Sequence, residues 1–88
     1  MSGAGEAWTR VSALHREGRI ADAIAGYDEI LRANPRHAAA LHYSGVAHYQ
    51  LGQLRPAFER LRAAVAIDAA DADAWSNLGL VLQAIGHW

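Results

Sequence analysis

Histidines are the residues of this chain that could support the widest range of chemistry, from metal binding to proton transfer. Their spacing favours neither, because no two lie four residues apart, no His-Glu-x-x-His motif occurs and the chain has no cysteine. We therefore expect no metal site. We interpret the five histidines as packing or solvent-facing side chains: His15, His37, His42, His48 and His87.

The acidic residues also fail to form a recognisable reactive or ion-binding set. Asp68, Asp71 and Asp73 lack the loop glycine and terminal glutamate of a calcium loop, and Asp71 has the position of a helix cap. No nucleophile-base set and no glycine-rich phosphate loop is present. We expect no catalytic residue and no cofactor, so any reaction would lie in another domain.

Composition places the 88 residues in one small helical domain, since 52% are hydrophobic and only two are proline. All eight basic residues are arginine and are interspersed with acids, giving a net charge of −1 and no basic patch for nucleic acid. No apolar run approaches the roughly 18 residues of a membrane span, and the start lacks the features of a signal peptide. We expect a cytoplasmic protein with no nucleic-acid or membrane partner.

The sequence repeats itself at a shift of 34 residues. The glycines at one position of this repeat follow helical patterns, where a left-handed residue is favoured and glycine adopts it without steric cost. The shift also aligns small residues inside the helical patterns. The aligned sets are Gly18, Gly52 and Gly86; Ala23 and Ala57; Gly45 and Gly79; Ala38 and Ala72; and Ala40 and Ala74.

Apolar residues between these glycines recur at steps of three and four, which is the period of an α-helix. Asn34-Pro35 marks one boundary, because proline disfavours a helical conformation in the residue before it. The pattern predicts an all-α chain with five helices. We place them at about residues 4–17, 20–33, 37–50, 54–67 and 71–85.

These features resemble the tetratricopeptide repeat (TPR) family, whose pattern is W-x2-L-G-x2-Y, then A-x3-F, then P. The third copy carries Trp75, Leu78 and Gly79 at this spacing. The first copy departs most, with Val11 at the glycine position. The other residues that fit the pattern are Leu41, Gly45, Ala57 and Leu61 in the second copy, and Leu14, Ala23, Tyr27 and Pro35 in the first.

The resemblance implies a helix-turn-helix repeat solenoid of about 2.5 units, stacked as a right-handed superhelix in a single domain over residues 1–88. The repeats would cover about 4–37 and 38–71, with a half repeat at 72–88. We expect the two helices of a pair to touch closely at Gly45 and Gly79, and Val11 to widen the first pair slightly.

In this family the first helix of each pair lines a concave groove that receives a peptide or protein segment, so the resemblance implies a non-catalytic interaction scaffold. Of the residues with which some members clamp a chaperone tail, only Asn77 is matched, so we do not expect that partner. The candidate groove residues are Trp8, Ser12, His15, Arg16, His42, Tyr43, Val46, Tyr49, Gln50, Asn77, Leu80 and Gln83.

The third repeat stops after its first helix, which predicts an exposed apolar surface on that helix. One hypothesis is self-association of the chain through this surface. The other is that the chain is a piece of a longer array, for instance the targeting arm of a larger enzyme such as a glycosyltransferase. The candidate self-association residues are Trp75, Leu78, Leu82 and Trp88.

Overall fold

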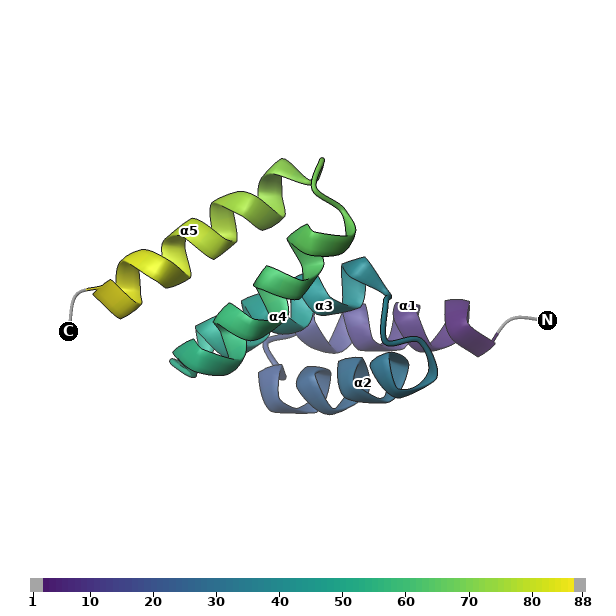
Figure 1. Ribbon diagram of the computed structural model, residues 1–88. Helices are drawn as coiled ribbons and strands as arrows, with labels where there is room; N and C mark the ends of the chain where they lie inside the picture. The colour runs from purple at the N-terminus through teal and green to yellow at the C-terminus, as the bar shows by residue number, and fades with distance from the viewer. Residues whose placement is uncertain (1–2, 87–88) are drawn as a thin grey trace.

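The computed structural model describes residues 3–86, which form five α-helices and no strand. Consecutive helices lie side by side in an open stack (Figure 1). The predicted bounds agree with the observed ones to within one residue at every end. The helices are α1 (Gly3–Arg16), α2 (Ile20–Ala33), α3 (Ala38–Gln50), α4 (Leu54–Ile67) and α5 (Ala72–Gly86).

Left-handed glycines make the turns inside the first two helix pairs. Gly18 and Gly52 have φ of 82° and 75°, a region that costs residues with a Cβ more than it costs glycine. Both predictions are confirmed. The third glycine, Gly86, differs because it lies within α5 and has no positive φ. A left-handed residue is needed where the chain turns into a next helix, and no further helix follows in the described residues.

Side chains cap the helices that begin the second and third units. The Nδ1 atom of His37 accepts a hydrogen bond from the Ala40 amide (3.1 Å), and the Asp71 carboxylate accepts one from the Ala74 amide (3.1 Å). Each bond satisfies an amide that lacks a partner within its own helix. The cap predicted at Asp71 is therefore confirmed.

The apolar side chains form two core clusters rather than one. The first joins α1, α2 and α3 around Val11 and Tyr27, which are each 1% exposed. The second joins α4 and α5 around Leu61 and Val81, which are each fully buried. Because α3 packs along α4, the clusters meet in the middle of the molecule.

A missing side chain allows close packing in each complete pair. A Cβ added to Gly45 would lie 2.7 Å from Leu61 Cγ, so the predicted close contact of α3 with α4 is confirmed. In the first pair the glycine is on the opposite helix, since a Cβ on Gly26 would clash with Val11 Cγ2. Val11 is thus accommodated by Gly26, a compensation that the repeat pattern does not indicate.

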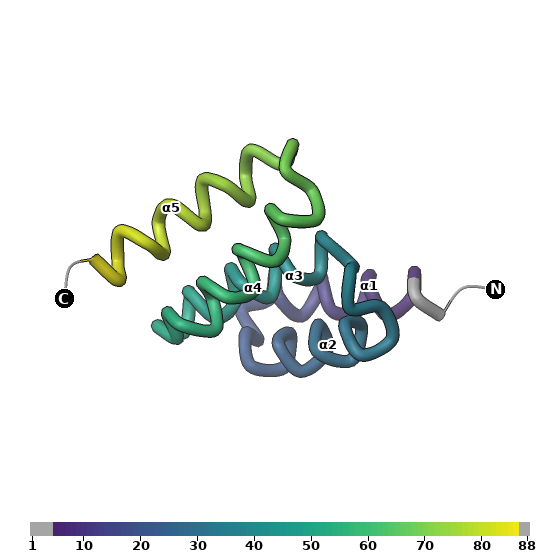
Figure 2. The backbone as a smooth tube through the Cα atoms, in the orientation of Figure 1, coloured from purple at the N-terminus to yellow at the C-terminus, as the bar shows by residue number. Residues whose placement is uncertain are grey.

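The helix tube in Figure 2 shows α1 to α4 gathered together and α5 extending along one side of α4. The molecule is elongated, with extents of 45 × 27 × 19 Å. The tightest helix pairing is that of α3 with α4, while α5 contacts α3 only slightly. Within residues 3–86, no helix has the length and apolar character needed to cross a bilayer.

Candidate functional site

Two hollows lie next to each other across α1, α3 and α5. The larger, about 410 Å³, is lined by the aromatic residues Trp8, Tyr27 and Tyr43 together with side chains of α1. The smaller, about 220 Å³, lies between α3 and α5. Val46 lines both hollows. The remaining lining residues are Ser12, His15 and Arg16 in the first, and Tyr49, Gln50, Leu61, Asn77, Leu80 and Val81 in the second.

Packed aromatic rings form one wall of the larger hollow. The Trp8 ring lies 5.9 Å from the Tyr27 ring and 5.8 Å from the Tyr43 ring, and it stacks on His37 at 5.3 Å. Tyr43 in turn stacks on His42 at 4.6 Å. Trp8 is therefore held by its neighbours, whereas Tyr43 remains 43% exposed and offers a ring to a partner.

The two ring nitrogens of His15, which lines this hollow, contact Tyr27 on α2 and Gln50 on α3. The His15 Nδ1 atom lies 2.8 Å from the Tyr27 hydroxyl, and its Nε2 atom lies 2.7 Å from the Oε1 atom of the Gln50 side chain. One neutral tautomer satisfies both contacts, because Tyr27 donates to Nδ1 and the Nε2–H donates to Gln50. Burial, with a smaller contribution from Tyr43, raises the pKa of Tyr27 to about 12, so its hydroxyl remains a donor at neutral pH.

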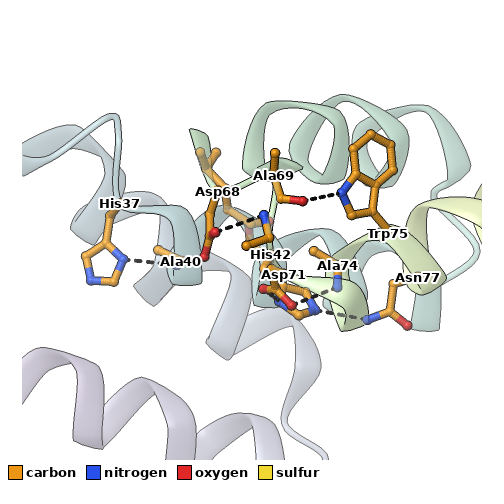
Figure 3. A network of polar contacts seen from close by, with 12 residues as sticks. His37, Ala40, His42, Asp68, Ala69, Asp71, Ala74, Trp75 and Asn77 are labelled. Atoms are coloured by element: carbon orange, nitrogen blue, oxygen red, sulfur yellow. Dashed lines mark hydrogen bonds and ion pairs between the residues drawn. The ribbon is translucent and has the colours of Figure 1, made fainter. Parts of the chain in front are cut away.

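His42 is buried and lines neither hollow; Figure 3 shows its ring together with Asp71 and Asn77. Its Nδ1–H donates to the Asp71 carboxylate at 3.1 Å, and its Nε2 accepts from the Asn77 amide at 2.9 Å. With 5% exposure and both nitrogens engaged, His42 joins α3 to α5 and offers no free group, which corrects its assignment as a groove contact. Asn77 lines the smaller hollow with one hydrogen-bonding group already in use.

Two further candidate residues lie at the margins of the groove. Arg16 is exposed at the edge of the larger hollow and makes no ion pair with another described residue. Gln83 is exposed on α5 but lines neither hollow. The guanidinium of Arg16 thus provides a positive charge beside the aromatic wall.

A third hollow, about 390 Å³, lies on the other side of α5, against the start of α4. It is lined by Leu54, Arg55, Phe58, Leu82 and Ile85.

Of the candidate self-association residues, Trp75 is 49% and Leu82 47% exposed, as expected. Leu78 is only 6% exposed because it packs into the α4–α5 core, and this corrects the expectation that it would face water. Trp88 lies outside the described residues.

Sequence reasoning missed two features of the structure. Arg60 on α4 donates to the Asp28 carboxylate on α2 (2.7 Å) and to the Ser44 hydroxyl on α3 (3.1 Å), which ties three helices together. No periodic signal marks this cluster, because its members come from different repeat positions. The second feature is a hollow of about 340 Å³ beside α1 and α2 that includes Gly26, Glu29 and Arg10.

In the part of the chain that the structure describes, no three His, Cys, Asp or Glu residues are grouped so that they could hold a metal ion. The polar groups near the hollows are engaged in hydrogen bonds between helices or stand alone at the edge.

Residues 45–86 match the family model described as TPR repeat, a segment that runs from the middle of α3 to the end of α5. No curated protein matches the chain. The matched segment and the five helices of the described residues together support a tetratricopeptide repeat family for this chain.

Proposed function

We propose that this chain binds a peptide or protein segment in the groove formed by α1, α3 and α5. TPR repeats are generally non-catalytic modules of protein interaction, and the match supports an interaction scaffold in general terms. The observation that carries the specific proposal is geometric. Ten of the twelve candidate groove residues line two hollows that adjoin at Val46.

The chemistry of this groove favours an apolar side chain accompanied by polar backbone contacts. Tyr43 and Tyr49 are 43% and 37% exposed, so they supply contact area and hydroxyl groups at small entropic cost. Trp8 and His15 are held in place by their own neighbours, which limits the rearrangement needed on binding.

Selection of short peptides from a displayed random library on the immobilised chain tests this proposal. The enriched peptides should bind a Tyr43→Ala, Tyr49→Ala double variant at least tenfold more weakly than the original chain. Trp75→Ala, on the other face of α5, is the matched control and should leave their affinity unchanged. If the peptides bound the double variant as tightly as the original chain, this groove would not be their binding site.

A second candidate function is association through the exposed face of α5. It is favoured by Gly79, which occupies the same repeat position as Gly45. A Cβ added to Gly79 would meet nothing within 4 Å. At Gly45 the same position receives Leu61 from the neighbouring helix. The face at Gly79 therefore has the form of a helix-packing surface without a helix on it in the described residues.

A further inference from the structure

The exposed side of α5 carries an alternating stripe of large and small residues. Trp75, Gly79, Leu82 and Gly86 are separated by four, three and four positions, which places them on one side of the helix. Trp75 and Leu82 are each about half exposed, and Gly79 faces open space. None of the four carries a charge.

Two glycines elsewhere in the chain show which side chains can pack against a glycine on a helix surface. Gly45 receives Leu61, and Gly26 receives Val11, in each case from the helix packed opposite. On α5 the glycines and the bulky residues lie on the same stripe. A surface of this kind is complementary to itself when it is turned end for end.

We propose that two copies of the chain pair through α5 in antiparallel orientation. A two-fold axis between positions 79 and 82 sets Leu82 of one copy over Gly79 of the second copy, and Trp75 over Gly86. The symmetry repeats each contact, so every large residue of the stripe lies against a glycine. This inference rests on the second candidate function and specifies its partner and register.

Electrostatics and area both bear on this pairing. In a homodimer a charged stripe would meet residues of its own kind, and this stripe is neutral; antiparallel helices also place unlike dipole ends together. A helix of 15 residues is about 22 Å long and about 10 Å wide. With the flanking Phe58 and Ile85 it would bury on the order of 1,000 Å² in total, the low end for a specific interface. We therefore expect a dimer with a dissociation constant in the micromolar range or weaker.

Sedimentation of the 88-residue chain over a concentration series measures the association. Gly79→Leu should weaken the dimer at least tenfold, because the new side chain occupies the place of Leu82 from the second copy. The variant should keep its fold, because an added Cβ meets nothing within 4 Å and leucine favours a helix. Circular dichroism checks that it does.

Leu82→Gln and Leu80→Gln form a matched pair, since the two leucines are 47% and 48% exposed on the same helix. Only Leu82 belongs to the stripe. Leu82→Gln should weaken the dimer at least tenfold and Leu80→Gln should leave it within about twofold. The reverse order would overturn the proposal.

Because the chain has no cysteine, Ala72→Cys introduces a single site for a spin label. The distance between the labels of the two copies then reports the relative orientation of their α5 helices. In the antiparallel dimer the two labels should be about 25 Å apart along the helices, whereas a parallel pair would hold them about 10 Å apart. A short distance, or a chain that stays monomeric at about 1 mM, would overturn the inference. If the chain stayed monomeric, the second candidate function would be contradicted as well. If it formed a dimer with a short distance between the labels, only the proposed antiparallel register would be contradicted.

Discussion

At Gly45 the absence of a side chain lets α3 and α4 approach until Leu61 fills the space, whereas at Gly79 the same repeat position faces no neighbour. The two glycines therefore contribute to stability in opposite ways, although the repeat aligns them. The first is required by packing. The second costs the helix conformational entropy without a compensating contact from another described residue.

Alanine substitutions should separate these two roles. We expect Gly45→Ala to destabilise the fold by about 1–3 kcal/mol, because its Cβ meets Leu61 at 2.7 Å and the Ala57 carbonyl oxygen at 3.3 Å. Gly79→Ala should stabilise it by up to about 1 kcal/mol through helix propensity. Urea unfolding of both variants measures the change in the free energy of unfolding. If the two changes had the same sign, the packing explanation would be contradicted.

Tyr27 predicts a specific loss of stability in alkali. Its pKa is raised to about 12 from an ordinary value of 10.0, so the folded state holds the phenolic proton more tightly than the unfolded chain does. Stability is therefore retained below pH 10 and falls as the pH rises through 12, by about 2 kcal/mol at pH 11.5. Urea midpoints at pH 9 and 11.5 test this. Tyr27→Phe should lack most of the fall and Tyr49→Phe should keep it; a fall of equal size in both variants would contradict the assignment.

At the scale of the elements, α5 is held by its core contacts with α4 and by one polar connection to α3. That connection is the His42 ring, whose two nitrogens join Asp71 at the start of α5 and Asn77 in its second turn. Since α5 also carries the smaller hollow and the exposed stripe, the position of both surfaces depends on this connection.

Removing Asn77 should loosen α5 selectively. Asn77→Ala leaves the buried Nε2 of His42 without its donor, which costs about 1–3 kcal/mol. We expect the amides of α5 to exchange hydrogen faster while those of α1 and α2 change little. Gln83→Ala, an exposed change on the same helix, is the control and should have almost no effect. Unchanged exchange in α5 of the Asn77 variant would show that the His42 connection does not hold the helix.

The sequence predicted the helices well because their ends depend on local residues. Gly18 and Gly52 make the turns and Asp71 caps the last helix, and each acts through its own backbone neighbourhood. Side-chain environments depend on residues far apart in the chain, and these the periodicity does not specify. His42 precedes exposed Tyr43 on α3, and its burial follows from Asp71 and Asn77, which lie 29 and 35 positions away.

For the same reason the groove was easier to outline than to describe. Repeat positions indicate twelve candidate residues for the proposed groove, and ten of them line the two hollows. The pairing of His15 with Tyr27 and Gln50, and the compensation of Val11 by Gly26, are matches between particular side chains on different helices. Such matches appear only when the helices are placed together.

At the scale of the whole molecule, two core clusters arranged end to end imply that stability is local. Val11 and Val81 are equally buried, at 1% and 0% exposure, but belong to different clusters. In a stack in which each unit contacts only its neighbours, damage to one end propagates weakly to the other. In a protein with a single core, either change would raise exchange throughout.

Matched core substitutions should reveal this. Val11→Ala and Val81→Ala each remove two methyl groups from a filled site, and we expect each to cost about 1–3 kcal/mol. Hydrogen exchange should then quicken in α1 and α2 for the first variant, and in α5 for the second, with α3 and α4 protected longest in both because they form the tightest pair. If the two variants gave the same exchange pattern, the chain would unfold as one cooperative unit, and the groove and the α5 stripe could not be loosened independently of each other.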